Sequence, residues 1–172
     1  MNLESTCAAC AAPPAATETE IARIPKISLV CPMCETYAQR QSLKPVVVMS
    51  CEGACLRGEI ARQAANRLCY TLAPAQTVRV CLGGAFTKDT GQRSLVRNAP
   101  RLIAVEGCFI KCATRMMQGV IEGLTPEVLI ADGLYDFDRE LFGIDEMDED
   151  EIRRHAASVA AQIAARLETP SS

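Results

Sequence analysis

Four short, mostly apolar runs follow one another from residue 46 onward, and each has the length of a buried β-strand. They are Val46–Ser50, Thr77–Leu82, Leu102–Val105 and Glu127–Ala131. The first run, VVVMS, shows no alternation of apolar and polar residues, which is typical of a strand covered on both faces. Polar or glycine-containing segments separate the runs, so the pattern predicts four strands.

The segments between and after these runs carry apolar residues at helical spacing. The predicted helices are Leu56–Tyr70, Thr90–Ala99, Lys111–Val120 and Glu151–Leu167. Pro100 ends the second of them, because the residue before a proline is disfavoured in a helical conformation. The acidic run DEMDEDE leads into the last helix. Acidic residues suit the positive end of a helix dipole, so this run needs no separate functional explanation.

Strands that alternate with helices predict an α/β protein, a small three-layer sandwich with a mainly parallel four-stranded sheet. The crossovers are expected to be right-handed, and the commonest small arrangement gives the strand order 2-1-3-4, with the first strand between the second and the third. The predicted α/β domain spans residues 45–168. Residues 1–44 are predicted to form a flexible, cysteine-containing N-terminal arm, because their first part is rich in Ala, Pro, Thr and Glu.

Charge and composition narrow the classes of partner. The 172 residues carry a net charge of −3, and the pI is about 5.3, which gives no electrostatic reason to expect nucleic acid or a membrane surface. No apolar stretch approaches the ~20 residues of a membrane span, and the N-terminus lacks a secretory pattern. We therefore expect a cytoplasmic protein. Its 10 cysteines then favour metal binding or redox chemistry over disulfides, since the cytoplasm is reducing.

Five cysteines directly follow the predicted strands: Cys51 and Cys55 the first, Cys81 the second, and Cys108 and Cys112 the third. In the predicted order these are three neighbouring carboxyl ends, where sites form in parallel sheets. Each pair precedes a helix, whose N-terminus favours the thiolate that binds metal. A structural zinc ion or an iron–sulfur cluster takes four such ligands. One of the five is therefore surplus, and spacing alone does not identify it.

The remaining cysteines carry less information. Cys69 lies on the apolar stripe of the first predicted helix, so core packing explains it better than a ligand role. Cys7 and Cys10, followed by Cys31 and Cys34, have a spacing close to that of a zinc ribbon. The segment between them lacks hairpin strands, so the alternative is an arm in which Cys7 and Cys10 have no role. The CPMC motif of Cys31 and Cys34 fits a redox pair, a ligand pair or both.

Three segments are distinctive as a set: SCEGACLRGEIARQAANRLC, VCLGGAF and VEGCFIKCA. Together they resemble the DGC-domain proteins, a family to which zinc binding is ascribed. The resemblance implies four shared cysteines that hold zinc, and in this sequence they fall on Cys51, Cys81, Cys108 and Cys112. Cys55 stands where many members have Ser. Glu106 replaces the Asp of the family's DGCxxxCA motif, so the resemblance implies that this carboxylate supports the ligands through hydrogen bonds.

The sequence therefore predicts a metal-binding protein with a cysteine cluster at the carboxyl ends of the strands, and zinc is the expected metal. Two alternatives use the same cysteines: a thiol redox or sulfur-transfer protein, and an iron–sulfur protein. The single histidine, His155, lies in the last predicted helix, which argues against a Cys–His catalytic pair. The sequence predicts neither an enzymatic reaction nor a particular protein partner.

Overall fold

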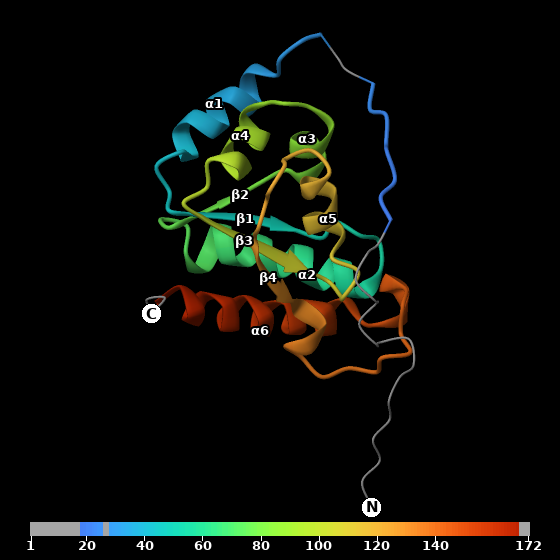
Figure 1. Cartoon of the computed structure of the whole chain (residues 1–172). Coiled ribbons are helices and arrows are strands. Elements are labelled where there is room, and N and C mark those ends of the chain that lie inside the picture. The colour runs from blue at the N-terminus through green and yellow to red at the C-terminus, as the bar shows by residue number, and fades with distance from the viewer. Residues whose placement is uncertain (1–17, 26–27, 169–172) are drawn as a thin grey trace, which may run out of the picture.

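A four-stranded sheet forms the centre of the computed structural model, which describes residues 18–25 and 28–168 (Figure 1). The strands are β1 (Val46–Ser50), β2 (Thr77–Arg79), β3 (Arg101–Glu106) and β4 (Glu127–Ile130). Their order is β2-β1-β3-β4, and all three neighbouring pairs are parallel. The predicted fold class and strand order are confirmed.

Helices cover both faces of this sheet, which gives the three layers seen in Figure 1. On one face lie α2 (Leu56–Arg67) and α6 (Glu149–Glu168). On the other lie α1 (Pro32–Gln41), α3 (Leu82–Thr87), α4 (Gly91–Arg97) and α5 (Cys112–Gln118). A π-helical turn, Leu68–Leu72, extends α2, and two 3-10 turns, Ala131–Gly133 and Ile144–Glu146, lie between β4 and α6. In the described part of the chain, no helix is long and apolar enough to cross a membrane.

Strand β1 is the centre of the core, and all five of its residues are buried. Val46 and Val48 pack in the cluster that includes α2 and α6, whereas Val47 and Met49 pack in the cluster on the opposite face. Side chains of a strand point to alternate faces, so a strand with helices on both sides has to be apolar throughout. This explains the absence of alternation in VVVMS.

The carboxyl end of β1 lies where the chain changes direction across the sheet. The connection from β1 to β2 runs through α2 on one face, and the connection from β3 to β4 runs through α5 on the other (Figure 1). The switch point of a parallel sheet, where binding sites commonly form, lies between the two strands whose connections diverge. Here those strands are β1 and β3, and the two pairs of cysteines follow them.

The segment before the sheet contains a helix that the sequence analysis did not predict. Residues 32–41 form α1, which packs against α4 (Figure 1). Ala38 is the one buried residue of this helix. The helix therefore needs no apolar stripe, and its sequence shows little apolar periodicity. The second strand also ends earlier than predicted, at Arg79, because Leu82 already begins α3.

Candidate metal centre

Two cysteine-containing turns meet at the switch point between β1 and β3. The backbone N–H of Cys51 donates to the carbonyl of Val105 at 3.0 Å, which continues the ladder between the strands into the first turn. Cys55 is the N-cap of α2. Cys108 lies in the turn after β3, and Cys112 is the first residue of α5. Both pairs therefore bring one sulfur to a strand end or turn and one to the start of a helix.

Glycines allow these turns to pack backbone against backbone. A Cβ atom at Gly107 would lie 2.8 Å from the backbone carbonyl of Arg57 and the backbone nitrogen of Gly58. A Cβ atom at Gly58 would in turn lie 3.0 Å from the Cα of Gly53. Any side chain at Gly107 would therefore separate the turn after β3 from the first turn of α2. The close approach requires glycine through lack of space, since Gly107 does not have a positive φ angle.

The thiols of the two turns influence one another. The pKa of Cys112 is raised to about 11, mainly by burial and in addition by the negative charges of Cys51, Glu106 and Cys108 and a hydrogen bond with Cys51. Burial is also the main cause that raises the pKa of Cys108, and the charges of Asp132, Cys55 and Cys51 add to it. Cys51, Cys55, Cys108 and Cys112 are thus close enough to interact electrostatically, and we call them the four-thiol group.

Glu106 supports the second turn from inside the protein. Its side chain is fully buried at the end of β3. One carboxylate oxygen accepts hydrogen bonds from the backbone N–H and the hydroxyl of Thr114, at 2.6 and 2.7 Å, and the other accepts from the N–H of Ala113 at 3.2 Å. These are free donors of the first turn of α5. The bonds hold the helix that begins with Cys112, which fits the supporting role expected for Glu106.

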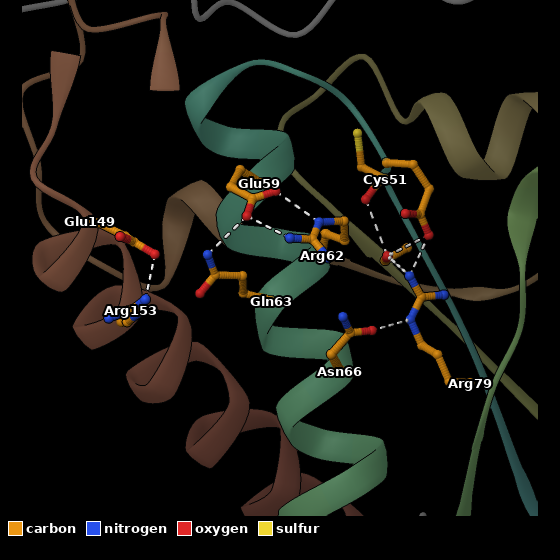
Figure 2. Close-up of polar contacts among 10 residues, drawn as sticks. Cys51, Glu59, Arg62, Gln63, Asn66, Arg79, Glu149 and Arg153 are labelled. Atoms are coloured by element: carbon orange, nitrogen blue, oxygen red, sulfur yellow. Dashed lines mark hydrogen bonds and ion pairs between the residues drawn. The ribbon is translucent and has the colours of Figure 1, made fainter. Parts of the chain in front are cut away.

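Arg79 supports the first turn in a comparable way, and the sequence analysis missed it. This arginine of β2 is only 7% exposed. It donates to Ser50 Oγ at 2.6 Å, pairs with the carboxylate of Glu52, and donates from Nε to Asn66 Oδ1 at 3.1 Å. Figure 2 shows the guanidinium reaching toward the turn of Cys51 and toward Asn66 of α2. A single charge inside the apolar run TVRVCL was the signal that could have identified it.

Asp132 is a second polar residue that sequence reasoning did not single out. It lies in the 3-10 turn that follows β4 and is buried, and its Oδ2 lies 3.4 Å from Nε of Arg57. Burial is the main cause that raises its pKa, while Arg139 and Arg57 lower it. Because the carboxyl ends of parallel strands share one edge, the position after β4 could have been predicted to lie near Cys108.

Cys81 lies apart from the four-thiol group and close to the CPMC motif. It is exposed at the N-cap of α3, and its charge is among the causes that raise the pKa of Cys34, after burial and the interaction with Cys31. Cys31 is exposed and Cys34 half-buried at the start of α1. The structure thus places Cys81 near the CPMC motif, although it follows the strand next to β1.

The remaining predicted cysteines are easily placed. Cys69 is 2% exposed and packs in the core formed by α2, α6 and the sheet, so its predicted packing role is confirmed. Cys7 and Cys10 lie outside the described residues. Within residues 18–25 and 28–168, no group of three or more His, Cys, Asp or Glu side chains is arranged to hold a metal ion. The four-thiol group is gathered at one edge, but its sulfurs do not form a ready-made coordination shell.

Comparison with known proteins assigns the family. The family model described as the DGC domain matches residues 47–167, and the chain therefore belongs to the DGC-domain family. No match was found among curated proteins or among solved structures. The resemblance seen in the three cysteine-containing segments is confirmed. Membership of a family to which zinc binding is ascribed fits metal binding in general.

The packing of Gly107 predicts a strong effect of its smallest substitution. Gly107→Ala should destabilise the fold by about 1–3 kcal/mol, because the added methyl group overlaps backbone atoms that cannot rotate away. Gly133→Ala is the matched control, since nothing lies within 4 Å of its Cβ position, and it should change stability by less than about 0.5 kcal/mol. Urea unfolding of the two variants measures both values. Equal stability of the two would contradict the backbone packing described above.

The hydrogen bonds of Glu106 predict a graded pair of variants. Glu106→Gln replaces one acceptor by an NH₂ group that faces the N–H of Ala113, and it should cost about 1–3 kcal/mol because a buried donor loses its partner. Thr114→Val removes the hydroxyl but leaves both backbone donors paired, so its cost should be near 1 kcal/mol. Denaturant unfolding measures both. A Glu106→Gln protein as stable as the wild type would show that the carboxylate is not needed.

Proposed function

We propose that this protein binds a zinc ion through the cysteine thiolates of the two turns at the switch point. The observation that carries the proposal is the mutual interaction of the four-thiol group, contributed by two turns whose cysteines lie 57 residues apart in the sequence. Sulfur ligands in a set of four suit zinc, which adopts tetrahedral coordination in structural sites. Family membership supports the same conclusion.

Three ligands, Cys51, Cys108 and Cys112, belong both to the interacting group and to the cysteines that the family resemblance implies. For the fourth position we favour Cys55, because its charge acts on Cys108. The resemblance favours Cys81, which lies nearer to Cys34. The two candidates come from different turns, so single substitutions separate them.

The chain supplies the conditions that a thiolate site needs. Cys55 stands at the start of α2, where backbone N–H groups of the first turn and the helix dipole stabilise negative charge. Glu106 and Arg79 anchor the two turns through buried hydrogen bonds. A bound zinc ion would cross-link both turns and neutralise the charges that raise the pKa of Cys112.

Elemental analysis of single variants tests this assignment. Protein purified without chelator should contain about one zinc ion per chain. Cys51→Ser, Cys108→Ser and Cys112→Ser should each lose it and melt at a lower temperature, because removing a structural metal removes folding free energy. Cys69→Ser is the control that should keep the metal, since this residue packs in the core.

The fourth ligand follows from the remaining pair of variants. Cys55→Ser should lose zinc and Cys81→Ser should retain it. The reverse result would establish the ligand set implied by the family resemblance. A brown protein that contains iron would establish an iron–sulfur cluster in the same thiols. Metal-free wild-type protein whose thiols are alkylated equally fast with and without chelator would exclude the metal proposal altogether.

The raised pKa values predict a large release of protons on metal binding. Cys108 and Cys112 have pKa values above the ordinary thiol value, so both are protonated at pH 7 in the metal-free protein. Zinc binds thiolates, and its uptake should therefore release up to about four protons and weaken as the pH falls. Titration calorimetry in two buffers with different ionisation enthalpies measures the release. A value near zero would contradict coordination by these thiols.

A further inference from the structure

The CPMC motif has the layout of a reactive thiol pair. Cys31 is the N-cap of α1, Pro32 occupies the first helical position, and Cys34 lies within the first turn. Both thiols are free; Cys31 is exposed to solvent and Cys34 is half-buried. Residues three apart on a helix are neighbours, with about 5–6 Å between their Cβ atoms. This spacing is within reach of the geometry that a disulfide requires after a small adjustment.

The pair is held on the folded domain by the contacts of α1. The carboxylate of Glu35 accepts a hydrogen bond from the N–H of Gly91 at 2.7 Å. A Cβ atom at Gly91 would lie 2.6 Å from Cβ of Ala38 and 2.8 Å from the carbonyl oxygen of Cys34. The start of α4 therefore fits directly against the first turns of α1. The hydroxyl of Tyr37 also donates to the carbonyl of Arg79 at 2.9 Å.

The two thiols differ in a way that suits successive steps of one reaction. Hydrogen bonds from the backbone and from the side chain of Cys34 lower the pKa of Cys31. Burial raises the pKa of Cys34, as do its interaction with Cys31 and the charge of Cys81. The exposed sulfur of Cys31 therefore loses its proton more readily, whereas the half-buried sulfur of Cys34 keeps its proton more readily. Attack by an exposed thiolate followed by a nearby thiol is the pattern of thiol–disulfide exchange.

We propose that Cys31 and Cys34 form a thiol–disulfide exchange centre, separate from the four-thiol group, that reduces exposed disulfides in small molecules or proteins. In the first step the Cys31 thiolate attacks one sulfur of the disulfide R–S–S–R. The S–S bond of the substrate breaks, a mixed disulfide Cys31–S–S–R forms, and the leaving thiolate R–S⁻ takes up a proton from water.

In the second step Cys34 gives its proton to water and its sulfur attacks Sγ of Cys31. The bond between Cys31 and the substrate sulfur breaks, the Cys31–Cys34 disulfide forms, and the second R–S⁻ leaves and is protonated. Two electrons pass from the pair to the substrate, which becomes two thiols. A dithiol reductant then reduces the Cys31–Cys34 disulfide by two exchanges of the same kind: its first thiolate forms a mixed disulfide with one cysteine, its second thiolate displaces that cysteine, and the reductant leaves as a disulfide while both cysteines return to thiols.

Peptide mapping of the full chain after reaction with oxidised glutathione at pH 7 tests the centre. The wild type should form the Cys31–Cys34 disulfide. Cys34→Ser should accumulate glutathione on Cys31, because the second step is blocked. Cys31→Ser should acquire glutathione on Cys34 at least about tenfold more slowly than Cys34→Ser acquires it on Cys31. Cys69→Ser is the control and should behave as the wild type, since this thiol is buried in the core formed by α2, α6 and the sheet.

Insulin serves as a second probe. Its reduction by the pair would show that disulfides in proteins, and not only those in small molecules, are substrates.

Reaction through Cys31 with either probe supports the proposal, and reaction with neither overturns it. Equal rates at Cys31 and Cys34, or a Cys34–Cys81 disulfide as the main product, also overturn it. Zinc content separates this inference from the proposed metal site. Cys31→Ser and Cys34→Ser should keep the wild-type zinc content; its loss would make the pair metal ligands and end the exchange proposal. Exchange in a wild type that binds no metal would leave this proposal standing and remove the other.

Discussion

The candidate site depends on the close approach of three backbone segments at the carboxyl ends of β1 and β3. Gly107 leaves no room for a methyl group beside Arg57 and Gly58, and Gly58 packs against Gly53 in the same manner. Van der Waals repulsion therefore requires glycine, and the two turns and the start of α2 form one layer of backbone. This backbone packing brings the cysteine pair of the first turn close to the cysteine pair of the second turn.

The repeated Glu-Gly dipeptide contributes to the two turns in different ways. Gly107 leaves no room for a side chain, whereas a Cβ atom at Gly53 would make only ordinary contacts with the sulfurs of Cys51 and Cys55. Glu106 is a buried carboxylate, and the N–H groups at the start of α5 compensate for its burial. Glu52 is exposed, and it instead neutralises the buried charge of Arg79 of β2. Similar sequences therefore anchor the two turns by different means.

Much of the fold could be predicted because it depends on local pattern and general topology. Apolar runs gave the strands, and the commonest arrangement of a small parallel sheet gave their order. Helix α1 could not be predicted in this way, since it buries only Ala38 and depends on docking to α4. Arg79 could not be placed either, because a charge inside a strand reveals neither its depth nor its partners. The topology also predicted that the candidate site lies at the carboxyl ends of the strands. The grouping of its cysteines required the positions of individual side chains, and their role as metal ligands stays a prediction.

Electrostatics gives the two groups of cysteines opposite tendencies. In the four-thiol group, burial and neighbouring negative charges raise the pKa values of Cys108 and Cys112. Such thiols keep their protons unless a cation replaces them, so the arrangement favours metal binding over nucleophilic attack. At the start of α1, hydrogen bonds lower the pKa of the exposed Cys31, which favours a thiolate without any metal. One cysteine-rich chain can thus hold thiols for a cation at the switch point and present a reactive thiolate on α1.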